Sequence, residues 1–293
     1  MNRRPRIFAL LFIFFSVIQV FGQSKLNTSI PFKSTNHNID IKYSVYLPDG
    51  YHHAKTYPTL FLLHGFGGDE TSWVIKGNAQ AILDSLINTK ILPPVVVVLP
   101  GVQNSYYIND YKGILPMEEI LVQEFIPYIN KTYPTDLRKT HRAVAGLSMG
   151  GYGATILPVK HPELFGTSIN LSGAVRTDEI FIQQTPAKYH QYFAPLFGES
   201  LSGTDRITPH WKANSPYYLI DSIKAQELKT IHWYIDCGTD DFLFDANKAM
   251  HEHFMKYKIP HEFHTRPGEH TWHYWRKGII LAMLFWGEIL RDN

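Results

Sequence analysis

The chain has 293 residues, of which 28 are Lys or Arg, 26 are Asp or Glu and 44% are hydrophobic. This balance excludes a disordered or low-complexity chain, and it leaves no strongly basic surface for binding nucleic acid. The length is sufficient for one large domain with a well-filled core.

Residues 1–22 have the pattern of a secretory signal peptide. Three arginines lie among the first six residues, and a 15-residue apolar run from Ile7 to Phe21 is interrupted only twice. The run is shorter than the roughly 20 residues that span a bilayer, although a retained N-terminal anchor is the alternative. Removing the leader leaves 25 basic and 26 acidic residues. We therefore expect a domain of residues 23–293 that is secreted or periplasmic and has no membrane contact after leader removal.

The single cysteine, Cys237, excludes an intrachain disulfide. The fold must therefore be stable by core packing alone. We expect Cys237 to be a small buried residue of that core.

Strand-like and helix-like segments alternate after the leader, which predicts an α/β architecture with a mostly parallel sheet flanked by helices. The predicted strands are residues 40–47, 58–63, 95–99, 142–146, 165–171, 231–236 and 262–266. The predicted helices are residues 116–130, 151–160, 243–257 and 271–290. Residues 174–222 hold four prolines and several aromatic residues and do not fit the alternation. We expect an inserted cap or a set of long loops there.

The sharpest motif is GLSMGG at residues 146–151, a G-x-S-x-G pattern centred on Ser148. A serine on a tight strand-to-helix turn needs small neighbours, because the flanking chain passes close by. Such a turn exposes the hydroxyl at the carboxyl edge of the sheet, beside the first N–H groups of the next helix. The pattern therefore predicts that Ser148 is a nucleophile. A tightly packed glycine turn without catalysis is the alternative.

A second glycine-rich segment, LHGFGG at residues 63–68, follows the predicted strand 58–63. Acyl transfer needs two donors for the oxygen of the tetrahedral intermediate. One is expected from the backbone N–H of Met149, directly after the nucleophile, and the other from the N–H of Phe66, with Gly67 as the second choice. An ordinary flexible loop is the alternative. A phosphate-binding loop is disfavoured, because no Lys-Ser/Thr pair follows the glycines.

A serine hydroxyl needs a base to take its proton, and the base needs an acid to orient it. In this architecture the acid follows a late strand. The segment that begins at Cys237 follows the predicted strand 231–236 and offers Asp240, Asp241 and Asp245. The pattern alone does not separate these three.

The base is expected near the C-terminal end, in PGEHTWH at residues 267–273. His270 directly follows the Pro-Gly turn and is favoured over His273, which lies one turn into the predicted helix. The histidine pairs that could hold a metal are His251 with His253, His261 with His264, and His270 with His273. None of them forms H-E-x-x-H, and one cysteine gives no thiolate cluster. We expect no metal and no cofactor.

Taken together, these motifs resemble the esterase D / feruloyl and acetylxylan esterase family of α/β-hydrolases. Four segments match in order and at sensible spacing: LLHGFGGDETSW at 62–73, RAVAGLSMGGYGA at 142–154, IDCGTDDFL at 235–243 and PGEHTWHYWR at 267–276. The segment at 118–134 is similar to the family's helix before the nucleophile strand. The resemblance covers nearly all of the mature chain and implies an α/β-hydrolase fold. Residues 174–222 are the departure, and they leave the substrate pocket unmatched.

The resemblance implies a serine carboxylesterase with Ser148 as nucleophile, Asp241 as acid and His270 as base. It also implies Phe66 and Met149 as the oxyanion donors. The expected reaction proceeds through an acyl-enzyme. The expected substrates are feruloyl, acetyl or other short acyl esters of plant polysaccharide or of small molecules.

Four aromatic residues are candidates for stacking on a sugar or phenolic ring: Trp73, Tyr106, Tyr107 and Trp211. They could equally belong to the core or the surface.

Three alternative functions remain. One is acyl transfer to a sugar, as in mycolyl-type transferases. Another is S-formylglutathione hydrolysis, which the export signal disfavours because that thiol substrate is cytosolic. The last is a non-catalytic carbohydrate-binding protein, which would need no Ser-His-Asp set.

Overall fold

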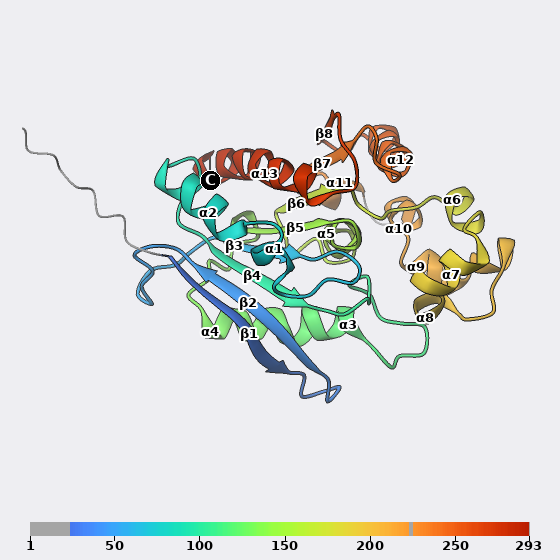
Figure 1. Cartoon of the computed structure of the whole chain (residues 1–293), viewed down its shortest axis with the longest axis horizontal. Helices are drawn as coiled ribbons and strands as arrows, with labels where there is room; N and C mark the ends of the chain where they lie inside the picture. Colours follow the sequence, from blue (N-terminus) through green and yellow to red (C-terminus); the bar gives the residue numbers. More distant parts are fainter. Residues whose placement is uncertain (1–23, 223–224, 293) are drawn as a thin grey trace, which may run out of the picture.

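The computed structural model describes residues 24–222 and 225–292. The predicted signal peptide at residues 1–22 lies outside the described residues. An eight-stranded sheet with the order β1-β2-β4-β3-β5-β6-β7-β8 forms the centre of the described part (Figure 1). Its strands are β1 (Lys25–Lys33), β2 (Asp40–Leu47), β3 (Thr59–Leu63), β4 (Val96–Gly101), β5 (Arg142–Leu147), β6 (Thr167–Leu171), β7 (His232–Gly238) and β8 (His261–Arg266).

The sheet is mostly parallel, which confirms the predicted fold class. Strands β1, β2 and β4 pair antiparallel. From β4 through β3, β5, β6 and β7 to β8, every neighbouring pair is parallel. Because parallel strands end at the same edge, the loops after β3, β5, β7 and β8 meet there.

Helices cover both faces of the sheet. Because successive side chains of a strand point to opposite faces, each central strand contributes residues to the hydrophobic core on either face. In β3, Phe61 and Leu63 belong to one hydrophobic cluster and Leu60 and Leu62 to the other. Figure 1 shows α2 and α13 on one side of the sheet, and α3 and α4 on the opposite side. Outside the cap, the helices are α1 (Ser72–Ile75), α2 (Ala79–Asn88), α3 (Met117–Glu119), η1 (Ile120–Phe125), α4 (Ile126–Thr132), η2 (Lys139–His141), α5 (Met149–Lys160), α11 (Ala225–Leu228), α12 (Phe244–Lys256) and α13 (Trp272–Asp292).

The helix predicted over residues 116–130 has an irregular centre. Its middle turn, η1, is π-helical and separates α3 from α4. Pro127 lies at the start of α4. A proline has no N–H for the helical ladder and its ring collides with the preceding turn, so regular α-helical bonding is broken at this point.

Residues 174–222 form the cap that was predicted as an insertion or long loops. They fold into short helices that gather at one end of the molecule in Figure 1. The helices are α6 (Asp178–Ile182), α7 (Pro186–Tyr192), α8 (Ala194–Phe197), η3 (Gly203–Arg206), α9 (Pro209–Ala213) and α10 (Pro216–Ser222). Thr177, Thr185 and Thr208 each accept a hydrogen bond from a backbone N–H of the first turn that follows. These threonine caps, two of them followed by proline, explain where the short helices begin.

Candidate active site

Ser148 lies on the turn between β5 and α5 in a strained backbone conformation. Its φ is 55° and its ψ is −115°, a region that side chains other than glycine rarely adopt. Three backbone hydrogen bonds hold the turn. The Ser148 N–H donates to the carbonyl of Leu171, and its carbonyl accepts from the N–H groups of Tyr152 and Ala174.

Two glycines make this turn sterically possible. A Cβ on Gly146 would lie 2.3 Å from the backbone oxygen of Gly150. A Cβ on Gly150 would lie 2.5 Å from the backbone oxygen of Leu63. The strand, the turn and the first turn of α5 therefore pack at distances that only glycine permits.

Ser148, His270 and Asp241 form a continuous hydrogen-bonded chain. The Ser148 Oγ lies 2.9 Å from the Nε2 of His270. The His270 Nδ1 lies 2.8 Å from one carboxylate oxygen of Asp241 and 3.0 Å from the other. The backbone N–H of Leu243 also donates to Asp241 at 2.8 Å, and the carboxylate is fully buried. The arrangement lets His270 take a proton from Ser148 while Asp241 fixes the ring orientation.

The other residues considered as acid or base are not part of this hydrogen-bonded chain. Asp240 is exposed, and its carboxylate accepts a hydrogen bond from the backbone N–H of Gly268. It therefore fastens the loop that carries His270 without touching the imidazole. Asp245 is exposed at the rim of the cleft beside Ser148, and His273 is exposed on α13.

The loop after β3 presents Phe66 rather than Gly67 as a free donor. The N–H of Gly67 is already bound to the side-chain oxygen of Asn104 at 2.7 Å. Among the described residues, no acceptor is recorded for the N–H of Phe66 or for that of Met149. Both groups remain available for an oxyanion.

His64 anchors this loop, a role that the sequence motif did not indicate. Its Nδ1 contacts the carbonyl of Gly65 at 2.8 Å, and its Nε2 accepts the N–H of Val102 at 3.1 Å. Burial lowers the pKa of His64, although the hydrogen bond to Gly65 opposes this effect. A neutral imidazole with the proton on Nδ1 satisfies both contacts. His64 therefore joins the loop after β3 to the end of β4.

A cleft of about 980 Å³ opens over Ser148. Its walls come from the loop after β3, the segment after β6, the cap and the loop before α13. Residues that line it include Phe66, Tyr106, Ser148, Tyr192, His270 and Trp272. Its size and its mixture of aromatic and polar walls suit a small organic substrate.

Of the four aromatic residues considered for substrate stacking, only Tyr106 lines this cleft. The indole N–H of Trp73 donates to the carbonyl of Leu63, and the hydroxyl of Tyr107 donates to that of His64. Trp211 stacks on Phe181 inside the cap, with ring centroids 3.7 Å apart. These three side chains are buried and pack the core instead of facing substrate.

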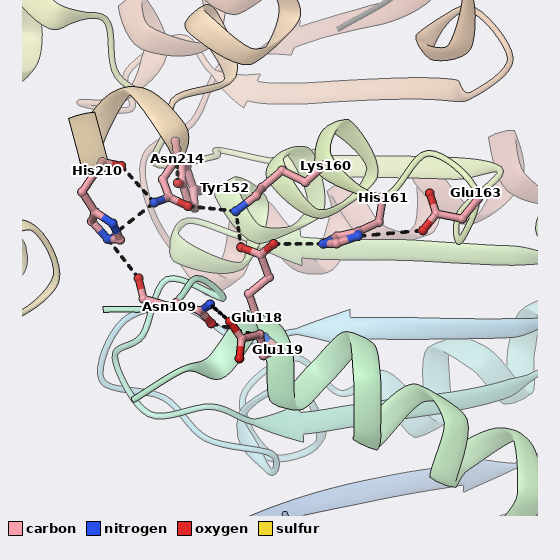
Figure 2. Close-up of polar contacts among 9 residues, drawn as sticks. All are labelled: Asn109, Glu118, Glu119, Tyr152, Lys160, His161, Glu163, His210 and Asn214. Carbon is pink, nitrogen blue, oxygen red and sulfur yellow. Dashed lines mark hydrogen bonds and ion pairs between the residues drawn. The ribbon is translucent and has the colours of Figure 1, made fainter. Parts of the chain in front are cut away.

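A polar network fastens the far end of α5 (Figure 2). Glu118 on α3 binds the ammonium of Lys160 and, at 2.9 Å, the Nε2 of His161. Lys160 also donates to the side-chain oxygen of Asn214 at 3.1 Å. The hydroxyl of Tyr152 donates to the Asn214 carbonyl. Helix α5, which begins directly after Ser148, is thus tied both to α3 and to the cap.

Among residues 24–222 and 225–292, no three His, Cys, Asp or Glu side chains are grouped as metal ligands would be. Across the same residues, every helix is too short or too polar to cross a bilayer.

The strand order, the turn carrying Ser148 and the histidine after the last strand define an α/β-hydrolase. The family model described as "Putative esterase" matches residues 34–285. The chain belongs to this esterase family, which confirms the resemblance seen in the sequence motifs. Esterases, the class that the description of this family names, hydrolyse carboxylic esters.

Known proteins similar to this chain agree with that family. An endo-1,4-beta-xylanase/feruloyl esterase of Xylanibacter ruminicola is 38% identical over 154 residues, which cover 50% of this chain and 21% of the relative. An acetyl esterase of Caldicellulosiruptor saccharolyticus is 27% identical over 244 residues, covering 80% of this chain and 85% of the relative. The solved structure of a ferulic acid esterase superposes with a TM-score of 0.77 at 28% identity, covering 91% of this chain and 99% of that one. The aligned part thus spans about a fifth of the first relative and most of the other two.

Proposed function

We propose that the chain is a secreted serine esterase in which Ser148, His270 and Asp241 act as nucleophile, base and orienting acid. The observation that carries the proposal is the 2.9 Å contact between the Ser148 Oγ and the His270 Nε2, continued to the buried Asp241. A serine hydroxyl is a weak nucleophile unless a positioned base accepts its proton.

The geometry supports a two-step reaction. The Ser148 Oγ attacks the ester carbonyl as its proton moves to the Nε2 of His270, and the oxygen of the tetrahedral intermediate meets the N–H groups of Phe66 and Met149. His270 then returns the proton to the leaving alcohol, which leaves an acyl-Ser148. Water, activated by the same imidazole, releases the acid.

The proposed substrates are feruloyl, acetyl or other short acyl esters, either on plant polysaccharide or on small molecules. The names of the similar proteins, a feruloyl esterase and an acetyl esterase, support this range. The aromatic walls of the cleft suit a phenolic or sugar ring.

A Ser148→Ala variant tests the mechanism. We expect it to lose about 10⁴-fold or more of kcat on p-nitrophenyl acetate and methyl ferulate, as removal of a triad member does. Ser202→Ala, an exposed serine of the cap, is the matched control and should keep full activity. A fluorophosphonate probe should label the wild-type protein and not the Ser148→Ala variant. Hydrolysis by Ser148→Ala at the wild-type rate would contradict the mechanism.

Two further experiments address location and acyl transfer. Expression of the full chain with its leader, followed by N-terminal sequencing of the exported product, tests cleavage near residue 22. Product analysis with and without a sugar acceptor separates hydrolysis from transfer of the acyl group.

A further inference from the structure

Arg176 is the cationic side chain held most firmly at the wall of the cleft. It lies in the segment between β6 and α6 and lines the same cleft as Ser148 and His270. Its Nη1 donates to the carbonyl of Ala174 at 2.7 Å. Its guanidinium lies over the ring of Phe193, 4.6 Å from the centroid, and interacts with the hydroxyl of Tyr106. These contacts hold the guanidinium in one place.

No carboxylate neutralises this cation within the part of the chain that the structure describes. None of the ion pairs recorded there includes Arg176. The other charged side chains of the lining are Lys76, Lys188 and Asp245, all exposed. Burial lowers the pKa of Arg176, but a guanidinium remains protonated in proteins. A guanidinium carries five N–H donors, and among the described residues only Ala174 and Tyr106 accept hydrogen bonds from Arg176.

Arg176 and the imidazole of His270 both line the cleft, but different rings surround them. The rings next to His270 are Phe242 and Trp275, at centroid distances of 4.6 and 4.7 Å. The neighbours of Arg176 are instead Phe193 and Tyr106. Because the leaving alcohol takes its proton from His270, the alcohol lies on the imidazole side. An acyl group that extends away from the imidazole would then reach Arg176.

We propose that Arg176 binds an acceptor oxygen at the far end of the acyl group, so that the enzyme prefers acyl groups oxygenated away from the ester. This inference rests on the proposed function, because it assigns the two halves of the substrate from the role of His270. A phenolic oxygen or a carboxylate would offer the same acceptor chemistry to the guanidinium. Such an oxygen would meet donors that the protein leaves unused and would counter a partly buried charge.

Four methyl esters of similar shape and the same leaving group test the proposal: methyl cinnamate, methyl p-coumarate, methyl ferulate and methyl 4-carboxycinnamate. We expect kcat/KM of the wild-type enzyme to be about 10-fold or more higher for the three oxygenated esters than for methyl cinnamate, as expected for one charge-assisted hydrogen bond. The ratio of kcat/KM between the p-coumarate and carboxycinnamate esters tells whether a phenolic oxygen or a carboxylate is preferred. In Arg176→Met, which keeps an unbranched apolar stem, the preference should fall to about 1, with methyl cinnamate within about threefold of wild type.

Lys188→Met is the matched control, because it removes an exposed cation from the same cleft. It should leave the preference unchanged. Arg176→Lys should keep part of the preference, since its charge remains without the planar donor pair. Equal losses on all four esters in Arg176→Met would make Arg176 a structural residue and overturn the proposal. Equal wild-type rates on all four would overturn it without any variant. Failure of the proposed function would give another result: the Ser148→Ala variant would hydrolyse each ester at the wild-type rate, or no ester would be hydrolysed at all.

Discussion

Replacing Glu118 by Gln should destabilise the fold measurably, although Glu118 is outside the cleft. Its carboxylate is 10% exposed and contacts the Lys160 ammonium, 22% exposed, and the His161 ring, 23% exposed. A hydrogen bond to a charged group contributes about 1.5–3 kcal/mol. Gln keeps one acceptor oxygen and loses the charge, so we expect a loss of roughly 2–3 kcal/mol in the free energy of unfolding, discounted for the partly exposed partners.

Urea unfolding at neutral pH, followed by tryptophan fluorescence, measures this difference. Thermal unfolding should show a decrease of about 4–10 °C, scaled from large single domains. Glu163→Gln is the matched control, because Glu163 is exposed and lies 3.8 Å from the other nitrogen of His161. An exposed pair of this kind contributes under about 1 kcal/mol. A Glu118→Gln variant as stable as Glu163→Gln would refute the assigned role of the network.

The effect of Glu118→Gln should depend on pH. Burial alone would raise the pKa of Glu118, but the hydrogen bond from His161 and the charge of Lys160 outweigh it, and the pKa lies below its ordinary value of 4.5. A carboxyl with a lowered folded-state pKa stabilises the fold above its unfolded-state pKa. This contribution is lost as the pH falls through the folded-state pKa. The difference between wild type and Glu118→Gln should therefore be complete above about pH 5 and shrink below pH 4.5.

Three further predictions concern residues in and around the site. Asp241→Asn should lower kcat by about 10⁴-fold, because an amide cannot stabilise the charged imidazole, whereas the exposed Asp240→Asn should stay within about tenfold of wild type; initial rates on one ester decide this. Gly153→Ala should cost about 1–3 kcal/mol in unfolding free energy, since its Cβ would lie 2.4 Å from the buried ring of Tyr107. The Cys237 thiol is buried, and burial raises its pKa, so a thiol reagent should react only after unfolding; rapid reaction of the native protein would contradict this.

The central strands could be predicted because their composition reflects their burial. The apolar runs at 58–63 and 95–99 became β3 and β4, whose residues are almost all buried. The edge strand β1 was missed, because most of its side chains are exposed and its sequence is largely polar. Helix α2 was also missed. It follows Asn78, which has a left-handed backbone with a φ of 55° and makes no side-chain capping hydrogen bond, so the usual N-cap geometry is absent at its start.

Ser148 and His270 could be matched across 122 residues because both follow strands that end at one edge of the sheet. The local sequence pattern could not decide whether Asp240 or Asp241 orients the histidine. The two are adjacent, and only the path of the chain after β7 buries one carboxylate and exposes the other. The choice between a binding and a packing role for Trp211 stayed open in the sequence for a related reason, since an aromatic residue type suits a packed cap as well as a binding wall.

The segment after β6 connects the turn at Ser148 to the side chain of Arg176. The Ala174 N–H donates to the carbonyl of Ser148 at 2.8 Å, and the Ala174 carbonyl accepts from Arg176. Ala174 thus connects the strained turn at Ser148 to the proposed acyl-binding guanidinium. The turn is specified by a short motif, whereas the position of Arg176 depends on Phe193 of the cap. Changes in the cap beyond Ala174 should therefore alter which ester is preferred before they alter whether Ser148 can react, because two of the three backbone bonds of Ser148, those with Leu171 and Tyr152, do not involve the cap.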